Sequence, residues 1–218
     1  MRRLLNLRWY QDPNTGLWVY GLPPIMGAMD TATFDQDSYQ GFNDDGDHDT
    51  ATQIADANTN WTQLVDSTFH MRFLLQNETA FAETNLRCDL QRQLNPVSSW
   101  VSVTGASTVA IATLGSLTDN ADTALRIGGA TNVTPNAGAD ETAGQTGGAS
   151  LDFPALSGRE VELVYSIQII GADVVDADTI EFRVTNKGTI FNTYTRTPVI
   201  TISKPSVGGR NRFHITSS

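Results

Sequence analysis

The chain of 218 residues contains one cysteine, Cys88, and few charged residues, which make up 17% of the sequence. A single cysteine excludes an internal disulfide framework. No stretch approaches the ~20 apolar residues of a transmembrane helix, and Asn6, Arg8 and Gln11 interrupt any apolar core of a signal peptide. We therefore expect no membrane partner, and a fold whose stability comes from sheet packing, oligomerisation or docking onto something larger.

Recognisable catalytic and metal-binding patterns are also missing. His70 lies among apolar residues, and nothing pairs it with Cys88 or with a serine as in a catalytic triad. Residues 43–49 resemble a calcium loop, but an EF-hand loop needs glycine at position six and glutamate at position twelve. Counted from Asn43, the glycine comes too early and Ile54 stands in place of the glutamate. We expect an exposed acidic turn, no metal, no cofactor and no enzymatic activity. A different kind of cation site at this turn, and a reactive thiol at Cys88, are the alternatives.

The sequence does contain an alternation of apolar and polar residues. Between residues 160 and 170 the apolar residues fall on odd numbers, with Glu162, Ser166 and Gln168 between them. This is the period of a β-strand with one face buried and one face in water. No segment has a convincing helical period, so the predicted fold class is all-β: an antiparallel β-sandwich, jelly-roll-like or immunoglobulin-like. Further strands are expected at 33–42, 69–75, 86–94, 100–103, 109–112, 124–127, 180–184 and near 200–202, with a surface loop at 128–149.

The first 24 residues indicate a separate docking arm. Residues 7–10 and 17–20 form aromatic-rich strands on either side of a strong turn signal at 12–16, and Pro23 and Pro24 make an extended linker. An isolated hairpin is marginally stable in water, so its rings must bury against the body or a partner. The predicted organisation is an N-terminal docking hairpin at 1–24, a β-sandwich domain at 25–203 and a basic C-terminal tail at 204–218.

The net charge of −10 is unevenly distributed. Six of the 14 basic residues lie in residues 1–8 and 204–218, which hold none of the 24 acidic residues, so the rest of the chain has eight basic residues and a formal charge of −16. Such a body repels nucleic acid, and the basic ends are too short to bind it. Basic ends suit docking on acidic protein surfaces, including a second copy of the chain; frayed ends that happen to carry arginine are the alternative. The predicted partner-binding residues are Arg2, Arg3, Arg8, Trp9, Tyr10, Trp18, Tyr20, Arg210 and Arg212, with Lys204 also expected to contact acidic surface.

Between about Phe34 and Ile202 a set of architectural residues follows the order of the expected strands. They are Phe69, Arg72, Phe73, Leu74, Leu90, Gln91, Trp100, Val103, 171–173, 178–180, 183–185, Tyr194, Thr197, Pro198 and 200–202. In these residues and in the order of its elements the chain resembles a family of β-sandwich proteins from the virions of tailed bacteriophages, mostly known as uncharacterised structural proteins. The sequence departs from the family at 91–93, where a tyrosine would be more usual after the glutamine.

The resemblance implies a structural protein of the virion. We predict a capsid decoration (cement) protein on the outer surface of the capsid, with the major capsid protein and further copies of itself, as a homotrimer, as its partners. A tail or head fibre module that recognises a host glycan is the alternative, although the chain has no repeat or coiled-coil stalk of the kind such fibres normally show. A virion-associated glycan hydrolase ranks third, because the acidic residues cluster in turns, where solvation is the simplest interpretation.

Overall fold

The computed structural model describes residues 8–11, 18–21, 31–47, 49–113, 115–117, 126–127, 139–141, 151–153 and 159–205. The chain forms two compact units, Met1–Thr31 and Ala32–Ser218. The first unit contains the predicted aromatic hairpin, in which β1 (Arg8–Gln11) pairs with β2 (Trp18–Gly21) in an antiparallel ribbon. Among the residues that the structure describes, no helix is long and apolar enough to cross a membrane.

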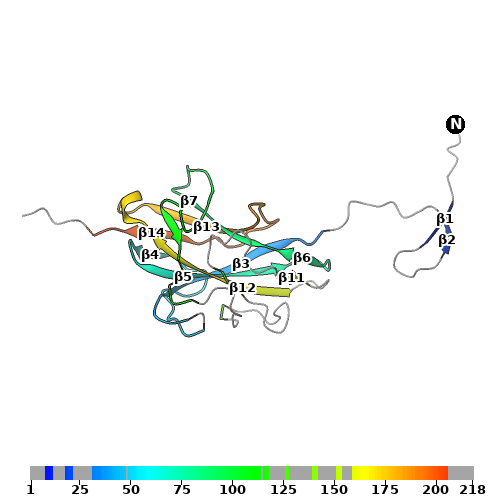
Figure 1. The fold of residues 1–218 in the computed structure, drawn as a ribbon, viewed down its shortest axis with the longest axis horizontal. Coiled ribbons are helices and arrows are strands. Elements are labelled where there is room, and N and C mark those ends of the chain that lie inside the picture. The colour runs from blue at the N-terminus through cyan, green and yellow to red at the C-terminus, as the bar shows by residue number, and fades with distance from the viewer. Residues whose placement is uncertain are drawn as a thin grey trace, which may run out of the picture. The chain divides into compact units, whose positions relative to one another are not determined.

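The second unit is built on two sheets that pack face to face (Figure 1). In the first sheet the strand order is β10-β12-β5-β3, and β9 also pairs with β12. All of its pairs are antiparallel except β10 with β12, so the segment expected to be a loop at 128–149 contributes a short parallel strand. The strands of this sheet are β3 (Phe34–Asn43), β5 (Thr68–Asn77), β9 (Ala110–Ala112), β10 (Ala139–Glu141) and β12 (Arg159–Ile169).

In the second sheet the strand order is β4-β14-β13-β7-β8, and only β4 with β14 is a parallel pair. Its strands are β4 (Trp61–Leu64), β7 (Cys88–Leu94), β8 (Val101–Ser102), β13 (Thr179–Asn186) and β14 (Val199–Ser203). A small ribbon joins β6 (Glu83–Leu86) to β11 (Leu151–Phe153), and a single 3-10 turn, η1 (Gly171–Asp173), lies between β12 and β13. The predicted all-β sandwich is confirmed.

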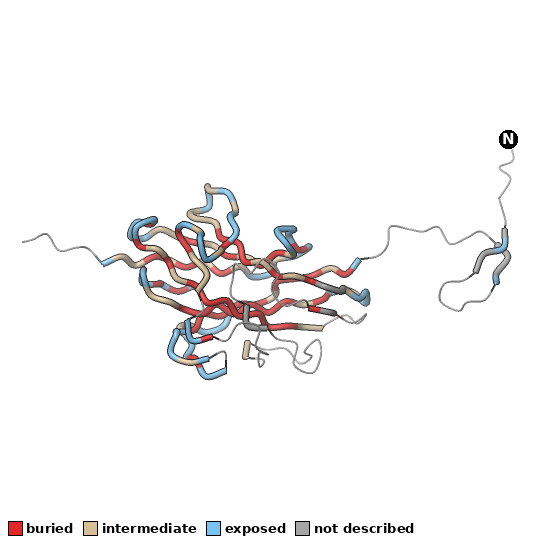
Figure 2. The backbone as a smooth tube through the Cα atoms, in the orientation of Figure 1, coloured by how far each residue is buried: buried red, intermediate tan, exposed pale blue. Residues whose placement is uncertain are grey.

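The alternation at 160–170 and 180–184 identifies the core faces of β12 and β13 correctly. The odd-numbered apolar residues of β5 and β12 meet the even-numbered apolar residues of β13 and β14 between the sheets, where buried residues gather (Figure 2). Phe73 and Tyr165 lie edge to face with ring centroids 5.9 Å apart, and the Tyr165 hydroxyl donates to the Cys88 carbonyl at 3.2 Å. Cys88 itself is buried, so its thiol packs as a small apolar group.

Two predicted strands differ in the structure. The run predicted at 86–94 is divided at Arg87, where the chain passes from the small ribbon into the second sheet. There the Asn186 side chain accepts from the Arg87 amide, and the Lys187 amide donates to the Arg87 carbonyl. Of the strand predicted at 124–127, residues 126 and 127 are described and are not in a strand; their amides bind a carboxylate instead.

The expectation that β12 has one face in water is wrong. Glu162 and Ser166, the polar residues of the alternation, are fully buried, as are His70 and Arg72 on the neighbouring strand. Three loops contact this outer face. Asp44 lies against His70, Gly115 packs over Ser166, and the amides of residues 126 and 127 donate to Glu162. This polar face is therefore part of the interior. Its burial is tolerated because loop residues form hydrogen bonds with its His70 and Glu162 side chains.

Candidate docking sites

The hairpin presents two exposed tryptophans on one face. Trp9 lies opposite Tyr20 and Trp18 lies opposite Gln11. Residues two apart on a strand share a face, so Trp9 and Trp18 stand at diagonal positions on the same side of the ribbon. Their side chains are 63% and 66% exposed, the largest exposures of any described aromatic side chain. Two adjacent indole rings in water are characteristic of a surface that a partner covers.

The other predicted partner-binding residues are placed only in part. The backbone positions of Arg8, Tyr10 and Tyr20 belong to β1 and β2. The remaining four, Arg2, Arg3, Arg210 and Arg212, lie outside the described residues.

Lys204 does not fit the prediction of a cation directed at a partner. Its Nζ donates to the carbonyls of Gly171 and Val174, at 2.6 and 3.1 Å, and its amide donates to the Asp176 carboxylate at 2.9 Å. A cation near carbonyls at the end of a helical turn satisfies acceptors that the turn itself leaves without a partner. Lys204 therefore fixes the end of β14 to η1 within its own chain.

The acidic turn is organised by internal hydrogen bonds. Asp45 accepts from the hydroxyl and the amide of Thr52, and Asp47 accepts from the amides of Asp49 and Thr50 at 3.0 and 2.9 Å. The hydrogen bonds from the Thr52 hydroxyl and amide lower the pKa of the Asp45 carboxyl below its ordinary value. Among the described residues no three His, Cys, Asp or Glu side chains are grouped so as to hold a metal ion.

Asp44 connects this turn to the buried face of the first sheet. Its Oδ1 accepts from the Ser116 amide at 2.7 Å and lies 3.0 Å from Nε2 of His70. Burial raises the pKa of the Asp44 carboxyl, but the hydrogen bonds from Ser116 and the attraction of His70 outweigh it, so the pKa is lowered. For His70, burial lowers the pKa, and Asp44 only partly offsets this.

His70 and Ser166 are direct cross-strand partners, and both have a buried polar atom without a hydrogen bond to the described residues: Nδ1 of His70 and Oγ of Ser166. Together with Asp44 they include the residue types of a hydrolytic triad. Both side chains have no exposed surface, however, and Gly115 packs directly over the Ser166 hydroxyl, where an added Cβ would lie 2.7 Å away. In the described residues these contacts fix the loops at Asp44 and at 115–116 to the sheet.

A buried ion pair on β5 and β12 fixes another loop, at residues 126 and 127, to the first sheet. Arg72 Nη1 lies 2.5 Å from Glu162 Oε2, and both side chains are buried. Glu162 also accepts from the amides of Arg126 and Ile127 at 2.8 to 2.9 Å. The Arg126 guanidinium donates to the Ala51 carbonyl and lies 4.4 Å from the centre of the Phe42 ring. These bonds satisfy a carboxylate that would otherwise be very costly to bury.

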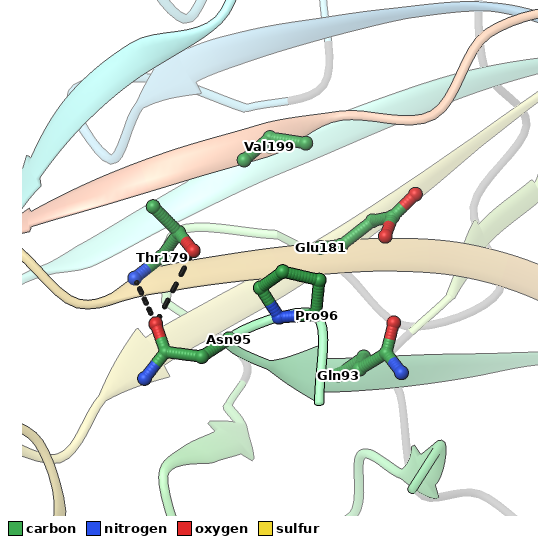
Figure 3. A pocket seen from close by; sticks show the side chains of 6 residues that line it. All are labelled: Gln93, Asn95, Pro96, Thr179, Glu181 and Val199. Atoms are coloured by element: carbon green, nitrogen blue, oxygen red, sulfur yellow. Dashed lines mark hydrogen bonds between the residues drawn. The ribbon is translucent and has the colours of Figure 1, made fainter. Parts of the chain in front are cut away.

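The outer face of the second sheet carries a small pocket. Gln93 of β7, Glu181 of β13 and Val199 of β14 are direct neighbours across three strands, and Pro96 stands beside them in the loop after β7 (Figure 3). The pocket has a volume of about 100 Å³ and is also lined by Asn95 and Thr179. Ligand pockets for small molecules and cofactors usually measure about 300 to 1,000 Å³. This one has the size to receive a side-chain tip or a few water molecules.

An arginine stacked on aromatic rings lies beside the pocket. The Arg183 guanidinium stands 4.1 Å from the centre of the Trp100 ring and 5.9 Å from that of Tyr194, and it donates to Gln91 Oε1 at 2.8 and 3.0 Å. Its charge is thus held in place by contacts within the sheet.

The alternation through 180–184 indicates that Glu181 and Arg183 face outward. The residues opposite them depend on strand register, which the sequence does not encode directly.

Comparison with known proteins gives no relative from which a site could be transferred. The chain matches no family model, no curated protein and no solved structure.

Proposed function

We propose that the protein is a virion structural protein, and in particular a capsid decoration (cement) protein that binds the outer face of the shell. The observation that carries the proposal is the pair of exposed tryptophans, Trp9 and Trp18, on one face of a hairpin that forms its own compact unit. A two-stranded ribbon buries too little surface to be stable alone. Its rings therefore need a partner surface, and the resemblance to phage virion proteins suggests the major capsid protein.

The physical mechanism is thermodynamic linkage. A protein that binds only the assembled shell stabilises the shell by its binding free energy. When several copies join as a trimer, the second and third arms bind at a high effective concentration, which raises the total affinity without any new type of contact. The sandwich supplies a firm base for the arms, since hydrogen bonds and a buried ion pair fix its loops to the first sheet.

The second candidate is a tail or head fibre module that recognises a glycan on the host surface. The same observation favours it, because exposed indole rings such as those of Trp9 and Trp18 also stack on sugar rings. The two candidates differ in where the protein lies on the particle and in what the rings contact.

Electron cryo-microscopy of purified virions, with the protein marked by a specific antibody fragment, separates these candidates. Decoration predicts label at regular positions over the head, and a shell that releases its genome at a lower temperature when the protein is absent. Label confined to the tail or fibres would overturn the decoration proposal and support the glycan-binding one. Absence of label from the particle would overturn both.

A further inference from the structure

The pocket on the outer face of the second sheet offers hydrogen-bond acceptors and lacks a positive charge. The Glu181 carboxylate forms no hydrogen bond or ion pair with the described residues. The Gln93 amide nitrogen donates one of its two N–H groups to the Ser98 carbonyl at 2.5 Å, and the amide oxygen accepts no bond from the described residues. The amide and hydroxyl of Thr179 already donate to Asn95. The Glu181 carboxylate is the one charged group among the lining residues, and with the Gln93 oxygen it is open to a donor, so the ligand that fits is a positively charged donor.

The shape and walls of the pocket narrow the choice of donor. Pro96 and Val199 give it apolar sides, against which the aliphatic stem of a long cationic side chain packs while its charged end reaches a carboxylate. One carboxylate and one amide oxygen are too few for a Ca²⁺ site, which takes six to eight oxygen ligands. A guanidinium has several donors in a planar fork, carries its charge at all physiological pH values and pairs with a carboxylate through two parallel bonds. An arginine side chain matches the pocket best.

The chain itself contains a suitable arginine-rich segment. Residues 1–8 hold Arg2, Arg3 and Arg8 and no acidic residue, whereas residues 9–203 carry a formal charge of −16. This segment leads directly into the strand with the exposed Trp9. Val97, next to Pro96 of the pocket, is 93% exposed, so one apolar side chain lies near the acceptors. In the arm, the exposed ring of Trp9 directly follows Arg8. The charges and the apolar groups are thus complementary between two copies.

We propose that the pocket formed by Gln93, Pro96, Glu181 and Val199 receives an arginine from residues 1–8 of a second copy, and that this contact holds neighbouring copies together. The inference rests on the proposed docking role of the arm, and it identifies one surface on which the arm docks. A copy whose arm engages its neighbour can in turn receive an arm in its own pocket. This head-to-tail contact closes into a ring when the rotation between copies allows it.

Sedimentation velocity of the full-length protein over a range of concentrations tests the proposal without any capsid present. The wild type should self-associate, and Glu181→Gln should weaken the association about tenfold or more, because a charge-assisted pair is lost. Asp56→Asn is the matched control, since Asp56 is exposed, lies in another loop and has a carboxylate with no described partner. The control should associate as the wild type does. Both variants should melt at the wild-type temperature, which excludes a folding defect as the cause.

A charge exchange identifies the segment that enters the pocket. Glu181→Arg should abolish association, and combining it with Arg2→Glu, Arg3→Glu and Arg8→Glu should restore it. Association that Glu181→Gln leaves unchanged, a wild type that is monomeric at every concentration, or rescue only by changes at Arg210 and Arg212 would overturn the inference. Capsid binding is measured separately: particles decorated by a protein that does not self-associate refute this contact alone, whereas undecorated particles refute the proposed function.

Discussion

Nε2 of His70 lies 3.0 Å from Oδ1 of Asp44, and this contact connects a fully buried strand residue to an acidic turn 26 positions earlier in the chain. A carboxylate can only accept, so Nε2 carries the proton in the neutral imidazole. The same Asp44 oxygen accepts from the Ser116 amide at 2.7 Å. One carboxylate thus fixes two loops to the outer face of the first sheet.

This arrangement predicts that acid destabilises the protein. Burial lowers the folded-state pKa of His70 below its ordinary value of 6.5, so the unfolded chain binds the proton more readily. The contribution of the neutral His70 side chain to the free energy of unfolding is complete above about pH 6.5. It is lost as the pH falls below that value, because the unfolded chain then binds the proton. The melting temperature of the wild type should be lower at about pH 5.5 than at about pH 8. The expected difference is roughly 2 to 4 °C for each kcal/mol of stability lost.

Variants assign that effect to His70. Near pH 8, His70→Gln should be less stable than the wild type. Its melting temperature should fall little between pH 8 and pH 5.5, because glutamine does not bind a proton in this range. His48→Gln and His214→Gln are the controls, because these are the only other histidines in the chain, and they should keep the wild-type dependence. If His70→Gln retains the full acid sensitivity, a different group is responsible.

The ion pair of Arg72 and Glu162 predicts a large loss of stability on neutralising one partner. Glu162→Gln leaves a buried guanidinium without its counter-charge, which costs about 3 to 5 kcal/mol in comparable sites. Urea denaturation followed by tryptophan fluorescence measures this. Glu181→Gln makes the same chemical change on the surface and should stay within about 0.5 kcal/mol of the wild type. A Glu162→Gln protein as stable as that control would mean that water reaches the pair.

The strands and their core faces follow from the sequence because alternation is a local property. In β12 the odd-numbered residues from Val161 to Ile169 are all buried against the second sheet, as the pattern predicts. The break at Arg87 is not predictable in this way, because apolar residues continue on both sides of it. What divides the two strands is hydrogen bonding to Asn186 and Lys187, about a hundred residues later in the chain.

The covered face and the pocket depend on contacts between distant segments. Glu162 resembles a solvent-facing residue in the sequence, and only the amides of residues 126 and 127 and the Arg72 side chain make its burial possible. Gln93, Glu181 and Val199 become neighbours through the register of three strands. In contrast, the hairpin that carries the tryptophans follows from the sequence, because a strong turn signal lies between two short aromatic-rich strands.

The two compact units predict that the arm can be removed without unfolding the sandwich. Deleting residues 1–24 removes no residue of the described hydrophobic core, which begins at Ala32. Circular dichroism and thermal melting of the shortened protein should therefore match the full-length protein, while its binding to undecorated capsids should disappear. Loss of the β-sheet spectrum would mean that the hairpin belongs to the core of the sandwich.

The arginines of residues 1–8 predict that binding to the particle weakens as the salt concentration rises. Exposed ion pairs are worth only about 0 to 1 kcal/mol each, and salt screens them, but several arms on one particle act together. Arg2→Ala, Arg3→Ala and Arg8→Ala combined should lower the number of copies bound per capsid, and raising the salt concentration should do the same to the wild type. Occupancy that responds to neither treatment would make attachment apolar, through the aromatic hairpin alone.

Whether Trp9 and Trp18 attach the protein to the shell is tested by its binding to purified capsids that lack it. The full-length wild type is compared with a variant that combines Trp9→Ala and Trp18→Ala. Phe81→Ala is the matched control, because Phe81 is an exposed aromatic residue of the second unit. We expect the wild type and the control to saturate the outer surface of the shell. The double tryptophan variant, although equally stable, should bind at least about tenfold more weakly, because interface aromatics carry much of the binding energy. A double variant that decorates capsids as tightly as the wild type, or a wild type that does not bind them, would contradict the proposed role of the two tryptophans.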